Sequence, residues 1–168
     1  MEIKAIQAPL KAKYREDPAS ARITLVARAD GKDTPLACSV DLGRAIYEAE
    51  AHTGVGGTGT AACSGDLLLG ALAACAQITC QLVGAAMGIK IQSVGVIVEG
   101  TLDLRGTLGV ARDVPVGFES IRLGFDVKAP EATREQLDAL KRKTEEYCVV
   151  YQTLMKPPVV DLVWKEPA

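Results

Sequence analysis

This sequence has few aromatic residues and no excess of positive charge. Its 168 residues contain two Phe, four Tyr and one Trp, and 19 Lys and Arg face 21 Asp and Glu, for a net charge of −2 at pH 7. Nucleic-acid binding needs a basic stripe or patch, so the charge argues against a nucleic-acid partner. Hydrophobic residues make up 48% of the chain, and the predicted core is therefore aliphatic and rich in alanine.

Targeting and membrane signals are absent as well. Residues 1–17 lack the apolar run of a signal peptide. No stretch reaches about 18 consecutive apolar residues, the length that spans a bilayer. We therefore expect a cytoplasmic protein without a membrane partner, folded as one domain over residues 1–168.

Cysteine and histidine are too few for a disulfide scaffold or a metal centre. The chain has five Cys, an odd number, and a single His, His52. There is no C-x-x-C pair, so we predict no metal site. In a reducing compartment these thiols are either inert core residues or reactive ones.

The stretch Ser64–Met87 is the feature around which the rest is organised. Every position from 67 to 76 is apolar or Gly, and the next ten residues add only Gln77, Thr79 and Gln81 as polar side chains. Without a polar face at 3.6-residue spacing, this pattern predicts a helix buried on nearly all sides. We expect Ser64 as its N-cap, Asp66 in its first turn and Gly88 as its end.

The other segments predict short strands and helices in an α+β arrangement. Alternating residues predict a long hairpin of two strands within 89–105 and 117–128, and an amphipathic pattern predicts a helix over 133–147. The remaining expected elements are strands at 11–15, 22–28, 36–41 and 159–164, and short helices at 43–51 and 148–155.

A glycine-rich segment, residues 52–60, precedes the apolar helix. Residues Gly54–Gly59 match G-x-G-x-x-G, but the strand before it and the helix within it that a dinucleotide site requires are missing. We interpret it as a flexible or lid-like loop. His52 beside it is the one side chain that titrates near neutrality unperturbed, so it is a candidate for supporting a binding site.

Cys75 is the sharpest candidate for chemistry. A cysteine in a helix of Ala and Leu is most often inert packing. To react, its thiol needs a lowered pKa, and the dipole of its own helix fades within the first turn, far from Cys75. A cation must then reach it, and arginine suits because it stays charged when desolvated.

Four segments resemble one known family. Residues 64–75 (SGDLLLGALAAC) are similar to the helix that carries the first cysteine of the OsmC/Ohr thiol peroxidases. Residues 85–100 are similar to the end of that helix and the next strand, and 117–127 to a later strand. Residues 145–154 (EEYCVVYQTL) resemble the second-cysteine motif, usually Cys-Pro-Val-Tyr. The resemblance covers Cys63 to Trp164.

This resemblance implies a fold and an activity. The fold would be OsmC-like: an intertwined homodimer with two central helices, antiparallel sheets around them and active sites at the subunit interface. Cys75 would attack an organic hydroperoxide, Cys148 would resolve the product as a disulfide, and a dithiol reductant would restore both thiols without a cofactor.

The chain also departs from the family pattern. Gly65 stands where the best-studied members have the glutamate that holds the activating arginine, and Asp66 is next to it. Val149 replaces the proline after the second cysteine. We expect the activating arginine to be Arg15, with Arg22 and Arg28 as the next candidates. These departures indicate a divergent branch.

Because of these departures, the sequence is also compatible with a second function. The chain would be a non-catalytic OsmC-like binding protein that holds a hydrophobic ligand at the dimer interface. A carboxylate–arginine pair near Cys75 would favour the enzyme, and its absence would favour the binding protein.

Overall fold

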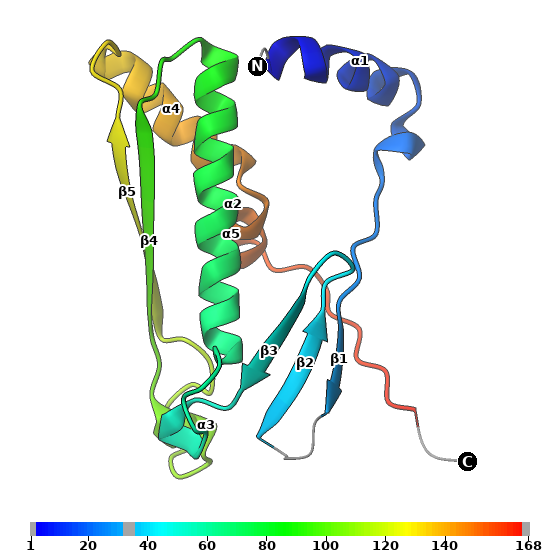
Figure 1. The fold of residues 1–168 in the computed structure, drawn as a ribbon, viewed down its shortest axis with the longest axis vertical. Helices are drawn as coiled ribbons and strands as arrows, with labels where there is room; N and C mark the ends of the chain where they lie inside the picture. Colours follow the sequence, from blue (N-terminus) through cyan, green and yellow to red (C-terminus); the bar gives the residue numbers. More distant parts are fainter. Residues whose placement is uncertain (1–2, 32–35, 166–168) are drawn as a thin grey trace.

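The computed structural model describes residues 3–31 and 36–165 and is centred on helix α2, Ser64–Met87 (Figure 1). The predicted bounds of this helix are confirmed. Its N-cap, however, is Cys63 and not Ser64, because the Asp66 carboxylate accepts a hydrogen bond from the Cys63 N–H at 2.9 Å in a capping box. Gly88 ends the helix with φ +73°, a left-handed conformation that favours glycine.

An antiparallel hairpin covers one side of α2. Strands β4 (Ser93–Thr101) and β5 (Ser120–Lys128) pair along their full length, with Val96 opposite Phe125. In β4 exposed and half-buried residues alternate, and the half-buried set packs toward α2. The predicted hairpin is confirmed, although its connection contains a short helix, α3 (Leu104–Thr107).

Two helices that follow the hairpin also pack on α2. Helix α4 (Arg134–Tyr147) starts at a Thr133–Gln136 capping box, and α5 (Val149–Met155) follows after a break at Cys148. Both confirm the predicted helices. Leu140 and Thr144 of α4 are buried, whereas Tyr147, its last residue, is 57% exposed and lies outside the packed face.

Residues 3–31 differ from the prediction. Helix α1 (Ile3–Glu16) replaces the strand expected at 11–15, since Ala, Lys, Gln, Leu, Arg and Glu all favour helix. A 3-10 turn, η1 (Pro18–Ala21), follows. Of the strand expected at 22–28 only Arg28 is paired, as the first residue of β1 (Arg28–Gly31).

A three-stranded antiparallel sheet is formed by β1, β2 (Ala37–Asp41) and β3 (Ile46–Glu50). Strand β2 was predicted, but β3 replaces the helix expected at 43–51. Gly43, with φ +80°, makes the turn, and β2 offers Val40 as a partner for Tyr47. Strand pairing therefore outweighs a weak helical pattern.

The C-terminal segment is not a strand, against the prediction for 159–164. It runs extended away from α5, and Val159 is 99% exposed. The strand prediction relied on β-branched residues, but within the described residues of this chain the segment has no pairing partner.

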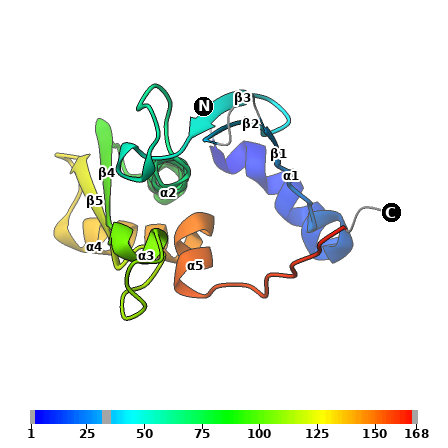
Figure 2. The same ribbon diagram turned by 90° about the horizontal axis from the view of Figure 1, so that it is seen from below.

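The burial of α2 also differs from the prediction. Its buried residues recur every fourth position along one stripe: Leu72, Ala76, Cys80 and Gly84. Figure 2, which looks along this helix, shows β4 and α5 on different sides of it. Other faces of the helix stay open in the single chain, and Ile78 is 55% exposed.

Candidate functional site

The two cysteines predicted for chemistry lie together. Cys75 is half-buried in the middle of α2, and Cys148, 1% exposed, occupies the break between α4 and α5. The two thiols pack against each other and shift each other's pKa, although 73 positions separate them. Both are free thiols. They sit in one apolar cluster with Leu72 and Ala76 of α2, half-buried residues of β4 and β5, and Tyr151 of α5.

Hydrogen-bond donors surround the Cys75 sulfur. Burial by itself would raise the pKa of this thiol, but the Val150 N–H, the Cys148 thiol, the Thr79 hydroxyl and the Val149 N–H outweigh it. The net result is a pKa of Cys75 below that of a free thiol, because each donor stabilises the thiolate.

Cys148 is perturbed in the opposite direction. Burial raises its pKa, and the neighbouring Cys75 raises it further, while the N–H groups of Tyr151 and Val150 offset part of the effect. Of the two thiols, Cys75 is therefore the one that ionises more readily, and Cys148 the one that keeps its proton longer. This arrangement provides one nucleophile and one thiol within reach of it.

The structure locates the stabilising donors elsewhere than expected. Val149 and Val150 belong to the first turn of α5, where backbone N–H groups have no partner within the helix. Sequence reasoning missed them because a backbone donor from a distant segment leaves no mark in the sequence. Thr79, one helical turn after Cys75, could have been found from the i,i+4 spacing.

Arg15, the arginine expected to activate Cys75, lies in a different kind of element. It is an exposed residue in the last turn of α1, not in a strand. Its role with Cys75 remains a proposal.

Cys80, the other thiol of α2, has a different environment. It is buried beside Thr144 of α4, and burial raises its pKa although the Thr144 hydroxyl partly offsets this. The Cys80 thiol is therefore harder to ionise than the Cys75 thiol.

Asp66 and His52 lie at the N-terminal end of α2, away from the two thiols. Asp66 is nine residues before Cys75, about 13 Å along the helix axis. Its hydrogen bonds to Cys63 lower its pKa, with a smaller contribution from His52. The His52 Nδ1 accepts a hydrogen bond from the Gly54 N–H at 3.0 Å and so caps a 3-10 turn, η2 (Thr53–Val55).

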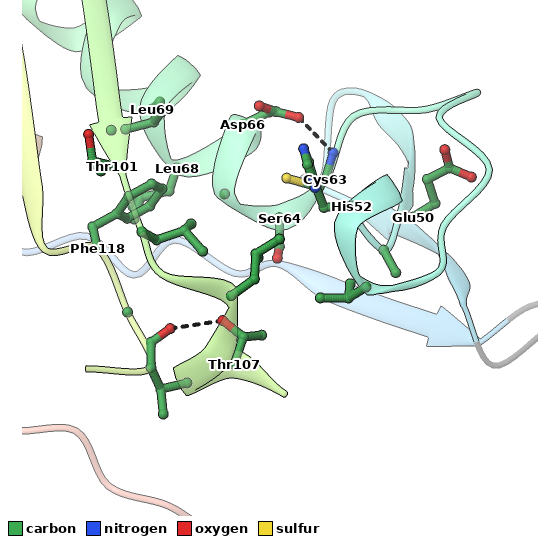
Figure 3. Close-up of a pocket in the computed structure, with 18 residues that line it drawn as sticks. Glu50, His52, Cys63, Ser64, Asp66, Leu68, Leu69, Thr101, Thr107 and Phe118 are labelled. Atoms are coloured by element: carbon green, nitrogen blue, oxygen red, sulfur yellow. Dashed lines mark hydrogen bonds between the residues drawn. The ribbon is translucent and has the colours of Figure 1, made fainter. Parts of the chain in front are cut away.

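These two residues line a pocket of about 820 Å³ (Figure 3). Its walls come from the glycine segment, the first turns of α2, the end of β4, α3 and Phe118. Gly65 has no side chain here, and a Cβ on it would come within 3.3 Å of the Phe118 ring. Most of the wall is apolar, with Leu69, Leu104 and Val116 among its residues.

Glu50, which was not a candidate from the sequence, holds the glycine segment in place by hydrogen bonds. Its carboxylate accepts hydrogen bonds from the Thr58 and Thr60 hydroxyls and from the N–H groups of Thr60 and Ala61. These bonds, with the Ala61 N–H the strongest, lower the pKa of Glu50 to about 2. The expected flexible or lid-like loop is thus attached to the end of β3.

The fold and the thiol pair define an α+β protein with a long central helix and two neighbouring cysteines. Residues 57–163 match the sequence model of the family described as OsmC-like protein, so the chain belongs to this family. The predicted fold class and family are confirmed.

Solved structures show the same fold at low identity. An OsmC-like protein from Mycoplasma pneumoniae matches with a TM-score of 0.68 and 18% identity, over 80% of this chain and 89% of that one. An organic hydroperoxide resistance protein from Legionella pneumophila matches with 0.58 and 18%, over 80% and 90%. The organic hydroperoxide resistance protein OhrB of Bacillus subtilis matches with 0.52 and 17%, over 80% and 93%. No curated protein sequence matches the chain.

The family also bears on the nature of α2. By length and composition this helix could cross a membrane, although polar residues interrupt its apolar run before about 18 positions are reached. In the structure one stripe of it packs on β4, α4 and α5. We interpret it as a core helix of the soluble OsmC-like fold.

Proposed function

We propose that this protein is a cysteine-dependent reductase of organic hydroperoxides. The observation that carries the proposal is the contact between Cys75 and Cys148, whose pKa values are shifted in opposite directions. Two of the structural relatives are organic hydroperoxide resistance proteins, which supports the choice of substrate. The resemblance of the segments around both cysteines supports it further.

The order of the steps follows from the opposite pKa shifts of the two thiols. The Cys75 thiolate attacks the distal oxygen of the hydroperoxide, the O–O bond breaks, and the alkoxide leaves and takes a proton to become an alcohol. Cys75 is then a sulfenic acid. The Cys148 thiol attacks its sulfur, which forms the disulfide and releases water. A dithiol reductant then reduces this disulfide by exchange and is itself oxidised.

The proposal includes a homodimer in the cytoplasm. Large apolar side chains stay exposed on α2, on β3 and in the segment before β1, among them Ile78, Ile46 and Leu25. Exposed apolar side chains of this size favour burial in an interface. A second copy would cover them, and an arginine, with Arg15 as the first candidate, would then complete the site at the subunit interface.

A single-turnover experiment tests the activity. Reduced protein mixed with cumene hydroperoxide should consume one equivalent and form one intramolecular Cys75–Cys148 disulfide, with Cys38, Cys63 and Cys80 still alkylatable. Peptide mapping identifies the bond. A disulfide from Cys75 to Cys63 or Cys80, or a Cys75→Ser variant that still reduces peroxide, contradicts the mechanism.

A second candidate function is a binding protein for a hydrophobic ligand. The observation that favours it is the largely apolar pocket of about 820 Å³ at the start of α2, separate from the thiol pair. If this is the function, an apolar fluorescent probe such as anilinonaphthalene sulfonate should bind the reduced protein. A bulky side chain at Gly100, whose Cβ would meet the Phe118 ring, should abolish that binding, and peroxide consumption should be absent.

A further inference from the structure

The break between α4 and α5 determines where the donors around Cys75 point. Cys148 has ψ 105°, so the chain is extended at this one residue between two helices. In an unbroken helix the N–H groups of Val149 and Val150 would donate to the carbonyls of Glu145 and Glu146. At the break neither N–H makes that bond. Cys75, Cys148 and Val150 lie in one cluster, where these N–H groups act on the Cys75 thiol.

The residues at the break do not themselves enforce it. Val149 and Val150 follow Cys148, and both can continue a helix, since β-branched residues lower helix propensity only slightly. A proline at position 149 would have prevented the bond to Glu145, because proline has no N–H and restricts the preceding residue to extended conformations. Another interaction must therefore favour the broken form.

Gln152 makes contacts on both sides of the break. Its backbone N–H donates to the Cys148 carbonyl at 2.9 Å, as part of α5. Its side-chain amide, half-buried, donates to the Glu145 carbonyl in α4 at 2.7 Å. Glu145 is the acceptor that Val149 would use if the helix were continuous, so the amide occupies the position of the competing bond.

We propose that Gln152 is a positioning residue for Cys75. Its side-chain amide donates to the Glu145 carbonyl across the break, and this bond keeps the first N–H groups of α5 directed at the Cys75 sulfur. This inference deepens the proposed function and rests on it for its biological meaning. The geometry of the break and its effect on thiol reactivity can be measured without a peroxide.

Gln152→Met tests the role, because methionine has a similar length and no donor. We expect the rate of Cys75 alkylation by iodoacetamide at pH 7 to fall about tenfold, the usual effect of weakening one hydrogen bond to a charged group. The rate is followed for the Cys75 peptide by mass spectrometry across a pH series. The midpoint of the pH profile should move upward.

Thr153→Val is the matched control. The Thr153 hydroxyl donates to the Val149 carbonyl at 2.8 Å, a side-chain bond of the same helix that does not span the break. The alkylation profile of this variant should equal that of the wild type. A similar loss in Thr153→Val and Gln152→Met would overturn the proposal, since general weakening of α5 would then suffice.

Val149→Pro completes the test. Proline at this first helical position fits the extended Cys148 and enforces the break, at the cost of one N–H donor. When Gln152→Met is added to Val149→Pro, the rate of Cys75 alkylation should differ less than twofold from that of Val149→Pro alone. An equal loss in both backgrounds would contradict the proposal, and the comparison remains available if Gln152→Met alone does not fold. Absence of peroxide reduction by the wild type would refute the proposed function and leave these results unaffected.

Discussion

The Thr79 hydroxyl offers a direct measure of how Cys75 is activated. It lies one helical turn after Cys75 and donates to its sulfur. Thr79→Val removes the donor and keeps the shape of the side chain, so the packing of α2 should not change. The thiolate loses a stabilising bond while the neutral thiol is little affected, and the pKa of Cys75 therefore rises toward that of a free thiol.

The magnitude follows from the surroundings. A hydrogen bond to a charged group contributes about 1.5–3 kcal/mol. Since Cys75 is half-buried, water replaces part of the lost bond, and we expect about 1.4 kcal/mol, which corresponds to about a tenfold change. Alkylation of Cys75 at pH 7 should slow by that factor and recover at high pH, where the thiol of the variant is also ionised.

Thr79→Ser provides the control because it keeps the hydroxyl. Its alkylation profile should resemble that of the wild type, and both variants should melt within a few degrees of it. If Thr79→Val reacts as fast as the wild type at pH 7, the hydroxyl does not stabilise the thiolate. The low pKa would then depend on the α5 backbone and Cys148 alone.

Three further predictions concern the rest of the molecule. If Arg15 completes the site, Arg15→Met should slow Cys75 alkylation at pH 7 by orders of magnitude, and an unchanged rate would shift attention to Arg22 or Arg28. Light scattering should give the mass of a dimer, and a stable folded monomer would contradict the proposed assembly. Glu50 has a pKa of about 2 against an ordinary 4.5, so its bonds stabilise the fold above pH 4.5 and this contribution is lost as the pH falls toward 2. In urea unfolding over that range, Glu50→Gln should therefore lose less stability with falling pH than the wild type does, and parallel curves would contradict this.

The central helix and the hairpin could be predicted from local sequence. The bounds of Ser64–Met87 follow from its uninterrupted apolar pattern and from Gly88, which ends the helix by a local conformation. The alternation of residues in β4 and β5 likewise determines which faces meet α2. These signals lie within the segment that they describe, so no other part of the chain is needed to interpret them.

The errors occurred where the structure of a segment depends on a partner outside it. Residues 43–51 have helical spacing, but β2 offers hydrogen bonds along Ile46–Glu50, and pairing prevails. Val159–Trp164 has the composition of a strand and no partner among the described residues of the chain. Local propensities amount to a few tenths of a kcal/mol per residue, which a paired neighbour readily overcomes.

The sequence by itself determined the family resemblance, the central helix and the identity of the two cysteines, because motifs and periodicity are properties of residue order. It also showed that the dipole of its own helix could not lower the pKa of Cys75. Only the tertiary structure decided which groups lower it. Besides the Thr79 hydroxyl and the Cys148 thiol, they are two backbone N–H groups of α5 that the helix break at Cys148 leaves without a helical partner. Backbone N–H groups are the same in every residue except proline, so no side chain in the sequence indicates these two.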